Sequence, residues 1–189
     1  DFGSNDNSVA SPFIGGRIAS ITEATNGSKT GLGFSTYLQS RTGADLMEFM
    51  RIDNLGNVGI GTDSPEAKLH VKSASAGSFT YDTTADDLIV ESNANGGITI
   101  ATAAANTGRI IFASPDDATG SEISFNQAST LMKLGTTTGS GILALQSGNG
   151  SEAMRINSSG AIKFNAYDGT NNTGSPTHIL GTDASGNVV

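Results

Sequence analysis

The chain has 189 residues and a formal net charge of −8 at pH 7, because 18 Asp and Glu outnumber 10 Lys and Arg. This acidic balance argues against partners such as nucleic acid or anionic membranes, and no apolar run approaches the roughly 18 residues of a membrane span. Without cysteine, the chain forms neither disulfides nor thiolate sites. Leu, Ile, Val and Phe make up 40 of the 189 residues, about 21%, which is close to the roughly 20% below which chains tend to be disordered. We therefore expect the chain to bury its apolar residues against other copies of itself.

In chain order, residues 1–12 are polar and predict a lead-in or linker. A first β-repeat unit is expected over residues 13–71, because short apolar alternations bounded by Gly, Asn and Asp predict strands. Near its end, Ser64–Lys68 predicts a single helical turn, with Ser64 as the cap and Pro65 at the first helical position. Residues 72–87 are expected to be a connector.

The most informative element of the first unit is the segment Met50–Thr62, in which a Gly-containing turn interrupts the alternation of apolar and polar residues. Gly56 lies where a three-residue hairpin loop needs a left-handed residue. The alternation predicts a β-hairpin whose apolar residues share one face, since alternate strand residues point the same way. These residues are Met50, Ile52, Val58 and Ile60.

A second β-repeat unit is expected over residues 88–164, since Gly108-Arg109-Ile110 repeats Gly16-Arg17-Ile18 and Met154-Arg155-Ile156 repeats Met50-Arg51-Ile52. The spacing between corresponding repeat residues grows by 12 or 13 positions between Phe125 and Met154, which predicts that Leu131–Leu145 is an inserted loop or hairpin. Gly160 is the expected turn glycine here, and the residues on the apolar face are Met154, Ile156, Ile162 and Phe164. Residues 165–189 are expected to be a C-terminal hairpin segment, because they contain a third, weaker copy of the pattern around Gly186.

A hairpin of this kind is marginal alone, and its apolar stripe is only one or two residues wide. Three chains that press such stripes together around an axis would bury them. The sequence therefore predicts an all-β fold: an elongated homotrimeric fibre of repeated β-hairpins, as a β-prism or intertwined triple-stranded β-structure. The predicted trimer core comprises the eight apolar hairpin residues of the two units.

The wording of Met50–Val71 resembles a segment of bacteriophage tail fibre and tailspike proteins, often found upstream of a C-terminal endosialidase-type intramolecular chaperone. Leu180–Val189 is similar to the stretch just before that chaperone domain, which is absent here. The resemblance implies a homotrimeric, extracellular virion fibre used for host attachment. It also implies other virion tail proteins and a host surface glycan or protein as partners.

Residue types with catalytic or ligand-binding potential are few. His70 and His178 are the two histidines, and His70 is expected at the surface or between chains. Two carboxylate groups, Asp116, Asp117 and Glu122 and then Asp86, Asp87 and Glu91, have the composition that glycosidases use, but their turn-rich context predicts solvated loops. Residues 168–172 offer oxygen ligands without the spacing of a calcium loop. Gly59 and Gly61 are expected to permit close packing or tight turns rather than to hold a phosphate.

These observations favour a structural and adhesive protein over an enzyme, with no cofactor and no metal. A polysaccharide-depolymerising tailspike remains the alternative from a different class, with catalytic carboxylates shared across chains. A capsid-borne fibre or a bacterial surface stalk is a further possibility with the same repeat pattern.

Overall fold

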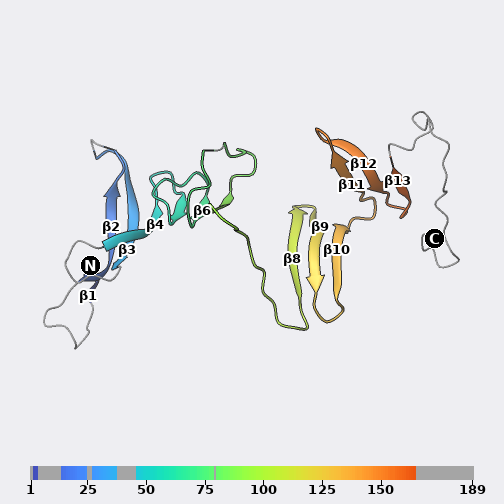
Figure 1. Ribbon diagram of the computed structural model, residues 1–189, viewed down its shortest axis with the longest axis horizontal. Helices are drawn as coiled ribbons and strands as arrows, with labels where there is room; N and C mark the ends of the chain where they lie inside the picture. Colours follow the sequence, from blue (N-terminus) through green and yellow to red (C-terminus); the bar gives the residue numbers. More distant parts are fainter. Residues whose placement is uncertain (1, 4–13, 25–26, 38–45, 79, 165–189) are drawn as a thin grey trace. The chain divides into compact units, whose positions relative to one another are not determined.

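The computed structural model describes residues 2–3, 14–24, 27–37, 46–78 and 80–164. These residues form strands and turns, with no helix among them, which confirms the prediction of an all-β chain. The chain divides into two compact units, Asp1–Ile98 and Thr99–Val189. Figure 1 shows the strands of both units, with labels on all but β5 and β7.

The first unit holds a seven-stranded sheet in which the spatial order of the strands follows the sequence. Its first five strands are antiparallel neighbours: β1 (Phe2–Gly3), β2 (Ile14–Thr22), β3 (Thr30–Tyr37), β4 (Leu46–Ile52) and β5 (Val58–Ile60). The last two, β6 (Leu69–Lys72) and β7 (Leu88–Glu91), continue the sheet in parallel. The strand β7 therefore pairs within the first unit, although its sequence was assigned to the start of the second repeat.

The second unit contains two three-stranded antiparallel sheets. One consists of β8 (Thr107–Ser114), β9 (Asp117–Asn126) and β10 (Leu131–Thr136). The other consists of β11 (Leu143–Ser147), β12 (Ser151–Ile156) and β13 (Ile162–Phe164). The stretch Leu131–Leu145, expected to be an insertion, thus contributes β10 and the start of β11.

The two predicted hairpins, β4–β5 and β12–β13, have the same architecture. Met50 pairs with Ile60 and Ile52 with Val58, as Met154 pairs with Phe164 and Ile156 with Ile162. The loops also match, since the backbone N–H of Gly56 donates to the carbonyl of Asp53 and that of Gly160 to the carbonyl of Asn157. The φ angles of these two glycines are 80° and 82°, the left-handed conformation that such a loop requires.

The predicted helical turn at Ser64–Lys68 is wrong. The Ser64 N–H donates to Thr62 Oγ1 at 3.2 Å, and the backbone of Lys68 bonds across the sheet in both directions. Its N–H donates to the carbonyl of Asp86, and its carbonyl accepts from the N–H of Val58. Sheet pairing therefore takes the backbone groups that a helix would need.

One face of the seven-stranded sheet carries two rows of apolar side chains from neighbouring strands in direct register. We call these two rows the apolar ribbon. The first row contains Ile18, Phe34, Met50, Ile60, Val71 and Val90. The second contains Leu32, Ile52, Val58, Leu69 and Leu88. Their side chains are half-buried or exposed, as for Leu88 at 49% and Leu69 at 36%.

The opposite face of the same sheet is covered over β5–β7 by loops of the same chain, in which the backbone N–H groups of Glu66 and Ala76 bond to His70 and Glu91. Its residues alternate with those of the ribbon and include Gly33, Gly59, His70 and Ile89, all of which are buried. In the part of the chain that the structure describes, Ala67 and Ile89 are the only buried apolar side chains, beside the buried polar residues His70, Glu91 and Ser124. The core of a single chain is therefore small, and most apolar side chains lie outside it.

The sheets of the second unit repeat this arrangement. Two rows cross β11, β12 and β13, with Leu145, Met154 and Phe164 in one and Leu143, Ile156 and Ile162 in the other. In the β8–β10 sheet, Ile110, Ile123 and Leu134 lie in register, beside Phe125 and Met132. Four of these five side chains are more than 40% exposed; Ile123 is half-buried.

Candidate functional site

A polar cluster is buried on the face of the sheet opposite the apolar ribbon. Because Leu69 and Val71 point into the ribbon, His70 between them points to the other face. Glu91 follows Val90 of the ribbon and faces the same way as His70. His70 is 1% exposed and Glu91 4% exposed, so both side chains are removed from water.

The hydrogen bonds of His70 fit a neutral imidazole. Its Nε2 lies 3.0 Å from Glu91 Oε2, and its Nδ1 accepts from the backbone N–H of Glu66 at 3.4 Å. Because Nδ1 faces a donor, the proton belongs on Nε2, which donates to the carboxylate. The ring of Tyr81 packs edge-on against the imidazole, with centroids 5.9 Å apart.

Glu91 is the centre of the cluster. Its Oε1 accepts from the Ala76 N–H at 2.7 Å, while Lys72 Nζ lies 3.0 Å from Oε2 and the Tyr81 hydroxyl 3.4 Å from it. The Ala76 N–H, with Lys72 and His70, lowers the pKa of Glu91 to about 2 against the opposing effect of burial. Burial, with hydrogen bonding to Glu66 and the charge of Glu91, raises the pKa of Tyr81 to about 12. The buried carboxylate is therefore ionised, and hydrogen bonds and the charge of Lys72 offset the cost of its burial, as a buried charge requires.

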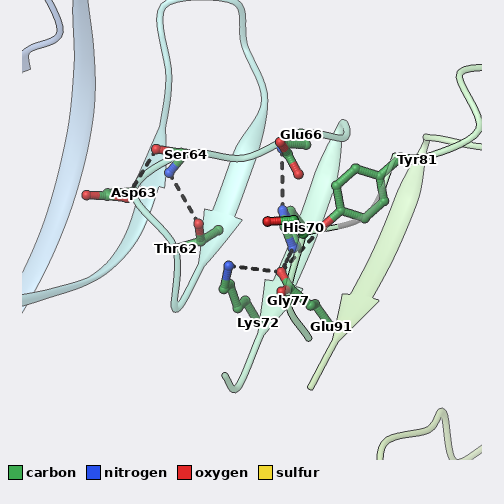
Figure 2. A pocket seen from close by; sticks show the side chains of 10 residues that line it. Thr62, Asp63, Ser64, Glu66, His70, Lys72, Gly77, Tyr81 and Glu91 are labelled. Carbon is green, nitrogen blue, oxygen red and sulfur yellow. Dashed lines mark hydrogen bonds and ion pairs between the residues drawn. The ribbon is translucent and has the colours of Figure 1, made fainter. Parts of the chain in front are cut away.

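A pocket of about 430 Å³ opens above this cluster. Figure 2 shows Thr62, Asp63 and Ser64 on one side and Tyr81 on the other, with His70 and Glu91 between them. Its lining is predominantly polar: hydroxyls of Thr62, Ser64 and Ser78, carboxylates of Asp63 and Glu66, and the ammonium of Lys72. Among the described residues, no group of three or more His, Cys, Asp or Glu side chains could hold a metal ion.

Close backbone approaches build the loop that forms one wall of the pocket. A Cβ on Gly59 would lie 2.6 Å from the carbonyl oxygen of Thr62, and one on Gly61 would collide with the carbonyl oxygen of Lys72. Gly61 also has a φ of 75°. These two glycines let the chain turn from β5 into the parallel strand β6 within residues 61–68, which is shorter than the dozen or more residues of a usual parallel crossover.

Two expectations about the cluster residues are wrong. His70 is neither a surface residue nor one that depends on another chain for its burial, and Glu91 lies in a strand and is not part of a solvated loop. The physical reason is the same for both, because the apolar neighbours occupy the ribbon face and force the polar residues to the covered face. Asp86 and Asp87 behave differently, since they precede β7 and their backbone carbonyls accept from Lys68 and Leu69.

The second carboxylate group lies in the second unit and does not converge on one point. Asp116 is exposed in the turn between β8 and β9, and Asp117 Oδ1 accepts from the Thr119 N–H at 3.0 Å. Glu122 accepts from Ser124 Oγ at 3.1 Å and lies 3.7 Å from Arg109 Nε. Asp117 and Glu122 therefore each have a local structural partner.

Several predicted residues lie outside the described part of the chain: Gly186, His178 and residues 168–172. Of the residues in the cluster, Lys72, Ala76 and Tyr81 received no functional prediction from the sequence. The signal for Lys72 was present, because Leu69-His70-Val71-Lys72 and Leu88-Ile89-Val90-Glu91 alternate in the same phase. Ala76 and Tyr81 belong to the loop between β6 and β7, where no periodicity reports which residues turn inward.

No protein-family model matches this chain, and a search of curated proteins finds no significant match. No helix among the described residues is long and apolar enough to cross a membrane.

Proposed function

We propose that this chain is a structural and adhesive component of a virion fibre, such as the shaft of a phage tail fibre or tailspike, in which three copies associate through their apolar ribbons. The observation that carries the proposal is the ribbon itself, a contiguous surface of apolar side chains in two rows across six neighbouring strands. Soluble monomers rarely expose apolar patches of more than a few hundred Å². Burial of each half-exposed aliphatic side chain contributes about 1 kcal/mol to association.

The shape of the ribbon favours threefold packing. It is only two residues wide, and its rows run across the strands. Three narrow ribbons that face a common axis enclose each other's side chains on both flanks, whereas two ribbons packed face to face leave their long edges open to water. The matching rows on β11–β13 extend the same argument to the second unit.

Host attachment and a place on a virion rest on the resemblance of Met50–Val71 and Leu180–Val189 to phage fibre proteins. Other tail proteins and a host surface glycan or protein are the partners that this function requires. An adhesive role without turnover agrees with the chemistry of the carboxylates: Glu91 is buried and held ionised, and Glu122 is hydrogen-bonded to Ser124. A glycosidase needs a carboxylic acid with a raised pKa beside a second carboxylate.

Labelled protein incubated with a panel of bacterial strains tests this proposal. Saturable adsorption to at least one strain, with no release of reducing sugars from its surface glycans, is the expected result. Glycan depolymerisation that disappears in Asp116→Asn, Asp117→Asn or Glu122→Gln variants would contradict it and favour the enzymatic tailspike.

A further inference from the structure

The connection between β7 and β8 contains an Asn-Gly pair, Asn95-Gly96, in which both residues are exposed. The pair follows a short bend in which the N–H of Ala94 donates to Ser92 Oγ at 3.3 Å. No hydrogen bond from the described residues engages the Asn95 side chain or the N–H of Gly96. The side-chain amide and the next backbone nitrogen are therefore both open to water.

An asparagine side chain and the backbone nitrogen that follows it can react with each other. The nitrogen loses its proton to hydroxide and attacks Cγ of the asparagine. A new C–N bond forms, and Nδ2 takes a proton from water and leaves as ammonia. Water then opens the resulting succinimide at one of its two carbonyl carbons and gives aspartate or isoaspartate. The reaction is intramolecular, so its rate depends on how readily the two atoms reach the geometry of attack.

Glycine at the attacking position favours this geometry. Gly96 has no side chain to hinder the approach of its nitrogen, and glycine adopts a wide range of backbone conformations. The next residue, Gly97, has open space where a Cβ would lie. Because Asn95 and Gly96 lie between strands and outside the described sheet ladders, closure of the succinimide ring breaks no backbone hydrogen bond there.

The pair Asn149-Gly150 has the same sequence in a different setting. It lies in the tight loop between β11 and β12, where Asn149 has a φ of 57° and Ser147 pairs with Ser151 across the loop. Ring closure rotates the backbone of the asparagine. Rotation at Asn149 therefore works against the strand pairing that holds both ends of the loop.

Asn57 shows the opposite extreme from Asn95. Its Nδ2 donates to Asp53 Oδ2 at 3.1 Å, and its Oδ1 accepts from Lys68 Nζ at 2.9 Å. The N–H of Val58, which would have to attack, donates to the carbonyl of Lys68. The attacking group and the leaving group are thus both held by hydrogen bonds.

We propose that Asn95 is a site of spontaneous deamidation and the most reactive asparagine in the part of the chain that the structure describes. The modification adds one negative charge to a chain whose net charge is already −8. In its isoaspartate form it also lengthens the main chain between β7 and β8 by one carbon. The inference depends on the local structure of the first unit and is independent of the proposed fibre function.

Incubation of the whole folded protein at mildly alkaline pH, followed by peptide mapping with mass spectrometry, tests the proposal. Asn95 should give aspartate and isoaspartate at least about tenfold faster than Asn149, since misplacement of reacting atoms by about 1 Å can cost on the order of a hundredfold in rate. In the urea-unfolded chain, the two Asn-Gly pairs should react at similar rates, because the structural difference between them is lost.

Two variants separate the attacking residue from its neighbour. Gly96→Ala places a methyl group beside the attacking nitrogen and should slow the reaction at Asn95 about tenfold. Gly97→Ala is the matched control and should leave the rate unchanged. Neither glycine has a positive φ, so alanine fits the backbone at both positions.

Three results would each overturn the proposal. The first is a rate at Asn149 in the folded protein that equals or exceeds the rate at Asn95. The second is a preference for Asn95 that persists in urea, which would assign it to sequence and not to structure. The third is a Gly96→Ala variant that deamidates at Asn95 as fast as Gly97→Ala.

Discussion

At the residue scale, His70 and Glu91 share the small interior of the first unit with the apolar side chains of Ala67 and Ile89. His70 and Glu91 are the most buried side chains of the cluster, and their partners come from two strands and two loops. Because the pKa of Glu91 is lowered on folding, this residue connects the stability of the β5–β7 region to acidic pH.

The first prediction concerns acid. The pKa of Glu91 falls from its ordinary value near 4.5 to about 2 on folding, so the unfolded chain binds this proton more tightly than the folded one. Its stabilising contribution is complete above pH 4.5 and is lost as the pH falls toward 2. Thermal unfolding of Glu91→Gln should show a lower Tm at pH 7 and a smaller loss of Tm between pH 4.5 and 2 than the wild type. An acid response unchanged from the wild type, or equal to that of the exposed control Asp116→Asn, would contradict it.

The second prediction concerns glycines with positive φ. Gly56→Val should cost roughly 1–2 kcal/mol per chain, because a β-branched residue is forced into the left-handed region. Gly61→Val should cost more, since it adds a collision with the carbonyl of Lys72 to the same strain. Gly135→Val is the control, because Gly135 lies in β10 with open space around it. Urea unfolding midpoints should fall in the order Gly135→Val, Gly56→Val, Gly61→Val, and any other order would count against the loop geometry.

At the element scale, the β4–β5 and β12–β13 hairpins are two copies of one design in different surroundings. Each has a Glu-x-x-Arg ion pair on its first strand, Glu48 with Arg51 and Glu152 with Arg155. In the first copy, Arg51 also donates to the carbonyl of Asp63, and β6 pairs with the outer edge of β5.

A third prediction follows from this difference. Arg51→Met should destabilise its hairpin by about 2 kcal/mol, the order expected for lost hydrogen bonds to a charged group. Arg155→Met should have a smaller effect, because Arg155 is more exposed and hydrogen-bonds to Glu152 on its own strand. Amide hydrogen exchange measures the two hairpins separately within one protein. Equal losses of protection in β4–β5 and in β12–β13 would show that the extra contacts of Arg51 contribute nothing.

The sequence predicts these hairpins well because their signals are local. The alternation around Gly56 and Gly160 specifies the loop, the register and the apolar face together. The parallel pairing of β5 with β6 and of β6 with β7 leaves no such signal. Apolar and polar residues alternate in Leu69–Lys72 in the same way whether the neighbouring strand runs parallel or antiparallel. The prediction of a helical turn at Ser64–Lys68 is wrong for a related reason. The backbone of Lys68 bonds to Val58 on β5 and to Asp86, which is distant in sequence. The burial of Glu91 likewise depends on loop residues that carry no periodicity.

At the scale of the whole molecule, the two faces of the first sheet differ in how well the chain itself covers them. Loops of the same chain cover His70 and Glu91 on one face, while the ribbon face lacks a cover among the described residues. A protein that left such a surface in water would tend to aggregate, which is why we propose a defined association of identical chains.

A fourth prediction tests whether association uses the ribbon. Ile52→Asp places a charge in the middle of a row, and it should dissociate the assembly because burial of an unpaired charge is strongly unfavourable. Leu55→Asp is the matched control, since Leu55 is 70% exposed at the tip of the same hairpin and outside both rows. Size-exclusion chromatography should show a shift to smaller species for Ile52→Asp alone. A shift in both variants, or in neither, would place the interface elsewhere.

Sedimentation equilibrium of the native protein tests the central claim most directly. The account predicts a single species with a mass of three times the 19.1 kDa of one chain, unchanged on dilution through the micromolar range. A folded, stable monomer of 19.1 kDa would contradict both the burial of the ribbon and the fibre function built on it.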